Sequence, residues 1–375
     1  MELTAGDWGD RYRAQRPLYE RFTDELATLL DKLLRASGID AVQIEYRTKE
    51  VDSFIEKIRR KGEKYDDPLR EISDLSGLRI IVYYLEDVER VGALLHEEFA
   101  LDGEHFNDAR PTAPDQFGYA SVHYVLRLSD TRTRNAEWRM FTNMAAEVQI
   151  RTALQHAWAA IDHKLQYKRP QSKGLPSVLQ RDLFRLSALL ELADKEFSAL
   201  RRATAATQEQ YSDRLEEGEL SIPLDSLSIE VYLDSAGVEE RWYERAIEKG
   251  YLEPIWDAFG SRSETAQLDR TYLLQVTQHA GLKTVAALDD VMSSAEEWGE
   301  SALDLYAQVC IEKTGEMPYA WPSDLITILV MMRFGIPPDV VPDPEYAEES
   351  DPWHWGGPTF DALFEAVDRF EGQST

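Results

Sequence analysis

Polar and apolar residues alternate along one short stretch of the chain, Ala146–Thr152. Val148 and Ile150 fall on one side of this pattern, and three polar residues fall on the other. These are Glu147, Gln149 and Arg151. A two-residue period over β-branched residues predicts a strand, and the apolar residues that follow, through about Tyr167, have helical spacing. We expect a strand that leads into a helix, with the polar face of the strand forming the floor of a cleft.

The rest of the first half alternates between helical and strand patterns. Apolar residues three and four positions apart predict helices at 10–37 and 86–100. Between them, the pattern predicts a short strand at 44–49 and a helix at 50–62. Residues 79–84 form an apolar run of strand length, which predicts a strand buried on both faces.

The second half of the chain has mostly helical patterns. Leucines at helical spacing predict one long helix at 176–213, and shorter helices follow, among them 284–298 and 302–314. Prolines separate the later segments. We therefore divide the chain into a first domain at 1–170 with its core at 40–170, a long connecting helix at 171–215, and an acidic, mainly α-helical accessory domain at 216–375.

Composition narrows the class of protein. The chain has 375 residues, of which 43% are hydrophobic, enough for a sizeable core. Its one cysteine, Cys310, excludes a disulfide framework and a cysteine-based zinc site. We find no apolar run long enough to span a membrane and no signal-peptide pattern at the N-terminus. We expect a cytoplasmic protein without a membrane partner.

The net charge of −28 is distributed unevenly. Residues 1–170 carry 25 Lys and Arg against 30 Asp and Glu, whereas residues 171–375 carry 16 against 39. The ordinary interpretation is that the acidic half keeps the protein soluble. The alternative is that it repels nucleic acid or competes for a basic cleft in the first half.

A basic cluster accompanies the predicted helix at 50–62. Lys49, Ser53 and Lys57 lie four residues apart and share one helix face, and Arg47 precedes them. Ammonium groups and a hydroxyl suit a triphosphate, and a guanidinium can stack on a base. An ordinary solvated basic face is the alternative.

Asp74 and Arg79 bracket the start of the buried strand. A carboxylate in this position is a natural Mg²⁺ ligand, although Asp74 would equally serve to cap a turn.

Residues 115–128 predict a turn that leads into a strand, and Tyr119, Ser121 and His123 alternate to one face of that strand. An exposed aromatic ring, a hydroxyl and an imidazole on one face provide the stacking plane and hydrogen-bond partners that a nucleobase pocket needs. A single histidine is more often structural, so the interpretation of His123 depends on these neighbours.

Four ordered motifs together carry a resemblance to a known family. They are Arg47-x-Lys49-x-x-x-Ser53-x-x-x-Lys57, Asp74-Leu-x-Gly77-x-Arg79-Ile, Gly118-Tyr119-x-Ser121-x-His123, and Glu147-x-Gln149-Ile-Arg151-Thr152. Over about residues 40–170, the chain resembles the synthetase domain of the RelA/SpoT family, the alarmone synthetases. The resemblance implies a nucleotidyltransferase-like α/β (α+β) fold, a mixed sheet flanked by helices.

The resemblance also implies an activity. Enzymes of this kind transfer the β,γ-pyrophosphate of ATP to the 3′-hydroxyl of GDP or GTP, which releases AMP and makes guanosine tetra- or pentaphosphate for stringent-response signalling. Mg²⁺ is the implied cofactor. By position in the motifs, Arg47, Lys49, Ser53, Lys57 and Arg79 would bind ATP. Asp74 and Glu147 would be catalytic and hold the metal, and Tyr119, His123, Gln149 and Arg151 would bind the acceptor.

The chain departs from the family pattern on the acceptor side. Asp115 stands where many members have lysine, Phe117 where the long enzymes often have asparagine, and Ala160 where glutamate is usual. A second hypothesis rests on Asp115 and Phe117, on the basic cluster from Lys57 to Lys64, and on the uneven charge of the two halves. The chain would then be a self-inhibited toxin–antitoxin fusion, used for example in phage defence, that pyrophosphorylates the 3′ end of tRNA and is restrained by residues 216–375.

A third hypothesis is a degenerate fold that senses nucleotides or binds a partner. The sequence also leaves open an oligomer, a protein trigger, and intramolecular regulation through residues 216–375.

Overall fold

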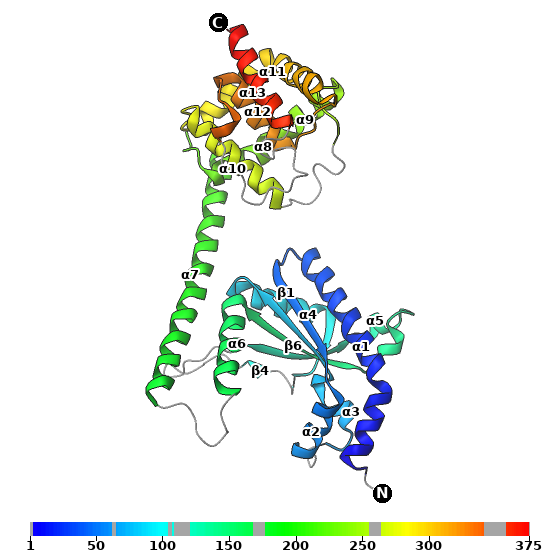
Figure 1. Ribbon diagram of the computed structural model, residues 1–375. Coiled ribbons are helices and arrows are strands. Elements are labelled where there is room, and N and C mark those ends of the chain that lie inside the picture. The colour runs from blue at the N-terminus through cyan, green and yellow to red at the C-terminus, as the bar shows by residue number, and fades with distance from the viewer. Residues whose placement is uncertain are drawn as a thin grey trace. The chain divides into compact units, whose positions relative to one another are not determined.

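A computed structural model of the chain describes residues 3–61, 65–103, 107–108, 121–167, 177–254, 264–340 and 358–374 (Figure 1). The chain forms two compact units, Met1–Arg201 and Arg202–Thr375. The division falls inside α7, a 40-residue helix at Ser177–Glu216. None of the helices among the described residues is long and apolar enough to cross a membrane.

The first unit is built on one mixed sheet (Figure 1). Its strands are β1 (Ala41–Thr48), β2 (Ser76–Val82), β3 (Phe99–Leu101), β4 (Asn107–Asp108), β5 (Val122–Leu128) and β6 (Ala145–Thr152). They lie in the order β1-β2-β6-β5-β3, with β4 also paired to β5. Only β2 and β6 run parallel among the described pairs. The predicted mixed α/β fold is confirmed.

Helices connect these strands. They are α1 (Ala5–Ala36), α2 (Val51–Lys61), α3 (Pro68–Glu71), α4 (Leu85–Glu98), α5 (Asp130–Thr133) and α6 (Ala153–Tyr167), with 3₁₀ turns at Ser73–Leu75 and Arg139–Phe141. Thr4 caps α1, since its hydroxyl accepts from Asp7 N. Apolar residues of α1, such as Phe22 and Leu26, form one buried core with Ile80 of β2 and Val148 of β6. This core covers one face of the sheet, and the opposite face carries polar residues together with the buried Ile81 and Val125.

Strand β6 has the predicted alternation in full. Its even-numbered residues are buried, and its odd-numbered residues are half-buried on the other face. Helix α6 follows at once and ends at Tyr167, also as predicted. Strand β2 differs from its prediction: Ile80, Ile81 and Val82 are buried, but Arg79 is half-buried on the polar face and Tyr83 is exposed.

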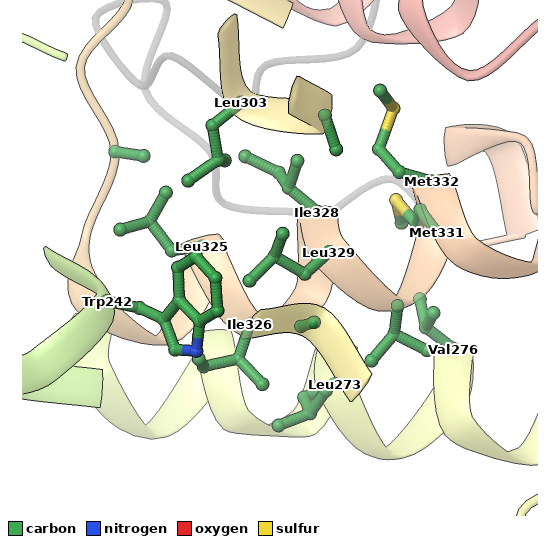
Figure 2. Packing of buried hydrophobic residues seen from close by; sticks show 14 of the residues in the cluster. Trp242, Leu273, Val276, Leu303, Leu325, Ile326, Ile328, Leu329, Met331 and Met332 are labelled. Atoms are coloured by element: carbon green, nitrogen blue, oxygen red, sulfur yellow. The ribbon is translucent and has the colours of Figure 1, made fainter. Parts of the chain in front are cut away.

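The second unit is helical throughout its described part. Its helices are α8 (Ser226–Ala236), α9 (Val238–Glu248), α10 (Glu264–His279), α11 (Val285–Thr314), α12 (Pro322–Phe334) and α13 (Pro358–Ser374), with a 3₁₀ turn at Pro338–Val340. Every residue of α12 from Pro322 to Met332 is buried. A helix that is apolar all round belongs at the centre of a domain. Figure 2 shows α12 surrounded by side chains of the neighbouring helices, among them Trp242 and Leu273.

Helix α11 corrects one prediction from the sequence. The pattern predicted separate helices at 284–298 and 302–314, but the structure has a single helix through Gly299. A Cβ at Gly299 would lie 2.5 Å from Cη2 of Trp242, which is fully buried. The glycine therefore admits the indole against the helix, and burial of this large ring offsets the roughly 1 kcal/mol that a mid-helix glycine costs.

Candidate active site

The polar face of the sheet carries a row of side chains that crosses its central strands. Glu45 of β1 pairs in register with Arg79 of β2, Arg79 with Gln149 of β6, and Gln149 with His123 of β5. Residues paired across neighbouring strands project from the same face. The row therefore brings together residues that lie far apart in the sequence.

A second row runs beside the first. Arg47 pairs with Gly77, and Gly77 pairs with Glu147. Because Gly77 has no side chain, the space between Arg47 and Glu147 stays open. All members of the two rows except His123 line a cleft of about 570 Å³, together with Asp74 in the 3₁₀ turn before β2. The predicted cleft floor on β6 is thus present in the structure.

Asp74 lies between two lysines at the end of this cleft. Lys49 Nζ is 2.6 Å from Asp74 Oδ2, and Lys57 Nζ is 2.9 Å from Asp74 Oδ1. Burial by itself raises the pKa of Asp74, but the hydrogen bonds and charges of the two lysines outweigh it and hold that pKa below its ordinary value. Asp74 is therefore ionised at neutral pH.

The path of the chain at Lys49 differs from the prediction. Helix α2 begins at Val51, so Lys49 lies in the turn before it and shares no helix face with Ser53. Backbone contacts fix this turn: Lys49 N donates to Leu75 O at 2.9 Å, and Tyr12 Oη donates to Lys49 O at 2.8 Å. Lys49 and Lys57 still converge on Asp74, whereas Ser53 is exposed on α2.

Glu45 is a member of the cleft that the sequence pattern did not single out. Its Oε2 accepts from Arg79 Nη1 at 2.5 Å, and its Oε1 lies 3.8 Å from His156 Nε2 of α6. Burial is the largest cause that lowers the pKa of the Arg151 guanidinium, and the nearby charge of Arg79 lowers it further. The charge of Glu45 raises that pKa. Glu45 thus balances two cations that stand on neighbouring strands.

Several buried polar atoms in this cleft or beside it have no hydrogen-bond partner among the described residues. They are Arg79 Nε, Arg151 Nε, His156 Nδ1 and Gln149 Oε1. Unpaired buried polar groups are costly, and a native structure usually retains them where a ligand completes the bonding. Two guanidinium N–H groups without partners favour an anionic ligand.

Glu147 accepts two hydrogen bonds through the same oxygen. His123 Nδ1 lies 3.2 Å from Glu147 Oε1, and Gln149 Nε2 donates to that atom at 3.2 Å. The bond from His123 is the largest cause that lowers the pKa of Glu147; burial opposes it, and Gln149 adds to it. Glu147 is an ionised carboxylate at the floor of the cleft.

Tyr119 lies outside the described residues, as do Asp115 and Phe117. Of the residues predicted to bind the acceptor, His123, Gln149 and Arg151 are described and lie together on β5 and β6. Ser121, at the start of β5, joins them.

The residues of the cleft fit a magnesium ion that binds together with a nucleotide. Asp74 and Glu147 are close enough for the charge of one to raise the pKa of the other. Among the described residues, no three or more His, Cys, Asp or Glu side chains are grouped to hold a metal. Mg²⁺ commonly takes one or two protein carboxylates and completes its shell with phosphate oxygens and water. The donor set suits that mode of binding and does not suit an all-protein metal cage.

The chain resembles known proteins over the part that carries most of this cleft. The family model described as "Region found in RelA / SpoT proteins" matches residues 46–172. GTP pyrophosphokinase YjbM of Bacillus subtilis (strain 168) is 33% identical over 171 residues, which are 44% of this chain and 74% of YjbM. GTP pyrophosphokinase YwaC of the same organism is 28% identical over 158 residues, 42% of this chain and 71% of YwaC.

Among solved structures, the crystal structure of small alarmone synthetase 1 from Bacillus subtilis matches with a TM-score of 0.43 and 25% identity, over 52% of this chain and 99% of that one. The match to the family model ends at residue 172, so the helical second unit lies beyond it. From the identity to YjbM over most of its length, together with the family model, the chain belongs to the RelA/SpoT family, and it is a pyrophosphokinase-type enzyme of the small alarmone synthetase kind with an extra C-terminal region.

Proposed function

We propose that this enzyme transfers the β,γ-pyrophosphate of ATP to the 3′-hydroxyl of GDP or GTP and so makes guanosine tetra- or pentaphosphate. The observation that carries the proposal is the position of two ionised carboxylates, Asp74 and Glu147, in one cleft between clustered cations and a row of hydrogen-bonding side chains. We expect the reaction in the cytoplasm, where both nucleotides are available.

ATP would occupy the cationic side of the cleft. Asp74 forms ion pairs with Lys49 and Lys57, and Glu45 forms one with Arg79. The Nε–H group of Arg79 has no hydrogen-bond partner within the described part of the chain. Arg47 is exposed at the rim, where its planar guanidinium can stack on the adenine. Ser53 would add a hydroxyl donor one helical turn before Lys57.

Asp74 and Glu147 would hold Mg²⁺ as it binds with ATP. When bound, the ion neutralises charge on the phosphates and orients them for attack. Such transfer needs positioning and charge neutralisation more than covalent participation by the protein.

Glu147 would also accept the proton of the acceptor. In the transfer, the 3′-oxygen forms a bond to the β-phosphorus of ATP, and the bond from that phosphorus to the α,β-bridging oxygen breaks. The electron pair of the broken bond leaves on AMP, and the proton of the 3′-hydroxyl passes to the Glu147 carboxylate. His123, Gln149 and Arg151 line the side from which the acceptor would approach, and Tyr119 would stack on its base.

Guanosine nucleotides are the preferred acceptor because both curated relatives, at 33% and 28% identity, are named GTP pyrophosphokinases. The 3′ end of tRNA is the alternative acceptor, motivated by Asp115 and Phe117. In that case residues 216–375 would act as an inhibitor or a sensor of a protein trigger.

The test is a transfer assay with ATP labelled on its β- and γ-phosphates. The full chain is offered GDP, GTP and bulk tRNA side by side with Mg²⁺, and Glu147→Gln is the matched control for adventitious kinases. Label in the guanosine nucleotides supports the proposal. Label in tRNA alone would replace it with the alternative. No label in any acceptor would reject the proposal but not the alternative, because a self-inhibited full chain would also label nothing.

A further inference from the structure

A continuous chain of hydrogen bonds links Arg151 to Glu147 through Ser121, which directly precedes β5, and His123 of β5. Arg151 Nη2 donates to Ser121 Oγ at 3.2 Å, and Ser121 Oγ lies 2.5 Å from His123 Nε2. His123 Nδ1 then lies 3.2 Å from Glu147 Oε1. Ser121 is only 6% exposed, so water has little access to its hydroxyl.

The chemistry of the two ends sets the direction of every bond between them. A guanidinium can only donate, so the oxygen of Ser121 accepts from Arg151. The ionised carboxylate of Glu147 can only accept, so His123 carries a proton on Nδ1. The hydroxyl proton of Ser121 finds one acceptor among the described residues, Nε2 of His123. A ring nitrogen that accepts a hydrogen bond carries no proton, so this arrangement corresponds to the neutral imidazole with its proton on Nδ1.

We propose that Ser121 is a positioning residue, which fixes His123 in the Nδ1–H tautomer so that the imidazole holds one oxygen of Glu147 and leaves the other oxygen facing the cleft, where the metal and the acceptor would bind. The consequence for catalysis rests on the proposed function, because it assigns Glu147 the proton of the acceptor hydroxyl. The tautomer itself does not rest on that function.

The geometry of Glu147 is consistent with this role. Both hydrogen-bond partners, His123 Nδ1 and Gln149 Nε2, contact Oε1. Oε2 has no partner among the described residues and belongs to a side chain that lines the cleft. If the proton of His123 moved to Nε2, a ring lone pair would face Oε1, and the carboxylate would rotate away from its present position. Loss of the Ser121 hydroxyl removes the group that prevents this.

The first measurement is the tautomer of His123. Long-range proton–nitrogen correlation spectra of the full chain, labelled with ¹⁵N in histidine, distinguish Nδ1–H, Nε2–H and doubly protonated rings. The His123→Asn variant identifies the signal by its disappearance. We expect the Nδ1–H form in the wild type and a shift toward Nε2–H in Ser121→Ala. A wild-type neutral ring with its proton on Nε2 would overturn the proposal, and this result does not depend on any variant that folds poorly.

The second measurement is the rate. We expect Ser121→Ala to lower kcat by about tenfold and to leave KM for ATP unchanged. A decrease of this size is typical when one hydrogen bond to a group that contacts a charged side chain is lost. Ser121→Thr keeps the hydroxyl and should retain both the tautomer and most of the rate. Because asparagine presents an N–H near the position of Nδ1, Ser121→Ala should have little further effect in the His123→Asn background.

The two proposals fail in different ways. A chain that labels neither GDP nor GTP would contradict the proposed function and leave the tautomer result intact. If the Ser121→Ala variant makes the guanosine product at the full wild-type rate and its His123 keeps the wild-type tautomer, only the proposed role of Ser121 is contradicted.

Discussion

Lys49 Nζ lies 2.6 Å from Asp74 Oδ2, although the proposed reaction needs the lysine for phosphate and the carboxylate for metal. Lys57 holds the other oxygen of Asp74. Magnesium and ATP would therefore separate these ion pairs together, since the metal takes the carboxylate and the phosphates take the lysines. The two ligands should bind cooperatively.

This relationship predicts an unusual variant. Asp74→Asn should abolish most pyrophosphate transfer and yet bind ATP without Mg²⁺ about fivefold more tightly, because roughly 1 kcal/mol of ion pairing no longer competes for the lysines. Isothermal titration with and without Mg²⁺ measures this directly. Asp10→Asn removes the same charge from an exposed ion pair and should change nothing. Weaker metal-free ATP binding by Asp74→Asn would contradict the idea.

Glu147→Gln separates binding from chemistry. The amide is nearly isosteric with the carboxylate but accepts no proton at neutral pH, so we expect kcat to fall on the order of a thousandfold while KM for ATP changes little. Initial rates at saturating ATP and acceptor measure the effect. The exposed Glu137→Gln serves as the control. A variant that kept a tenth of the wild-type rate would exclude Glu147 as the proton acceptor.

Gly299→Ala tests the packing of the helical unit. Alanine normally stabilises a helix interior relative to glycine by about 1 kcal/mol. Here its Cβ would lie 2.5 Å from the Trp242 ring, which is fully buried. We expect the clash to prevail and to lower the free energy of unfolding by roughly 1–3 kcal/mol. Urea unfolding followed by tryptophan fluorescence measures it, with the exposed Glu297→Ala on the same helix as control.

Cys310 predicts a pH dependence of stability in the alkaline range. Burial raises the pKa of its thiol to about 11, and the hydrogen bond with Tyr306 opposes this only in part. A thiol whose pKa is higher in the folded state than in the unfolded one adds stability below the unfolded value of about 8.5, and that contribution is lost as the pH rises toward about 11.

Urea midpoints of the wild type and Cys310→Ala, compared at about pH 8 and about pH 10.5, check this expectation. The wild type should lose more stability than the variant over that interval. Equal losses would mean that the thiol titrates alike in both states.

Strand β6 and the helix α6 that follows it were predictable, because the sequence pattern that specifies each lies within the element itself. The two-residue period of β6 places Glu147 and Gln149 on one face whatever strands lie beside it, and the helical spacing after Thr152 predicted α6 to its last residue. The motifs then identified the family, and the structure brings several of their residues, among them Asp74, Arg79 and Glu147, into one cleft. Roles in binding ATP and the acceptor stay predictions until the assays above are made.

Other features depend on pairings between distant residues and had no local signal. Glu45 is 34 residues from Arg79, and only the β1–β2 register sets them side by side. Lys49 has the spacing of a helical residue but sits in the turn that Leu75 and Tyr12 hold in place. The link from Ser121 to Arg151 requires the antiparallel pairing of β5 with β6.

The period of β6 has a further consequence for the population of molecules in any sample. A slip of β6 by one residue against β2 and β5 would carry Glu147, Gln149 and Arg151 into the apolar core and turn Val148 and Ile150 toward the cleft. Such a molecule would bury three polar groups without partners and retain none of the catalytic face. A molecule with a misaligned sheet therefore has no partial activity. The specific activity of a preparation measures the fraction of molecules whose strands are correctly paired.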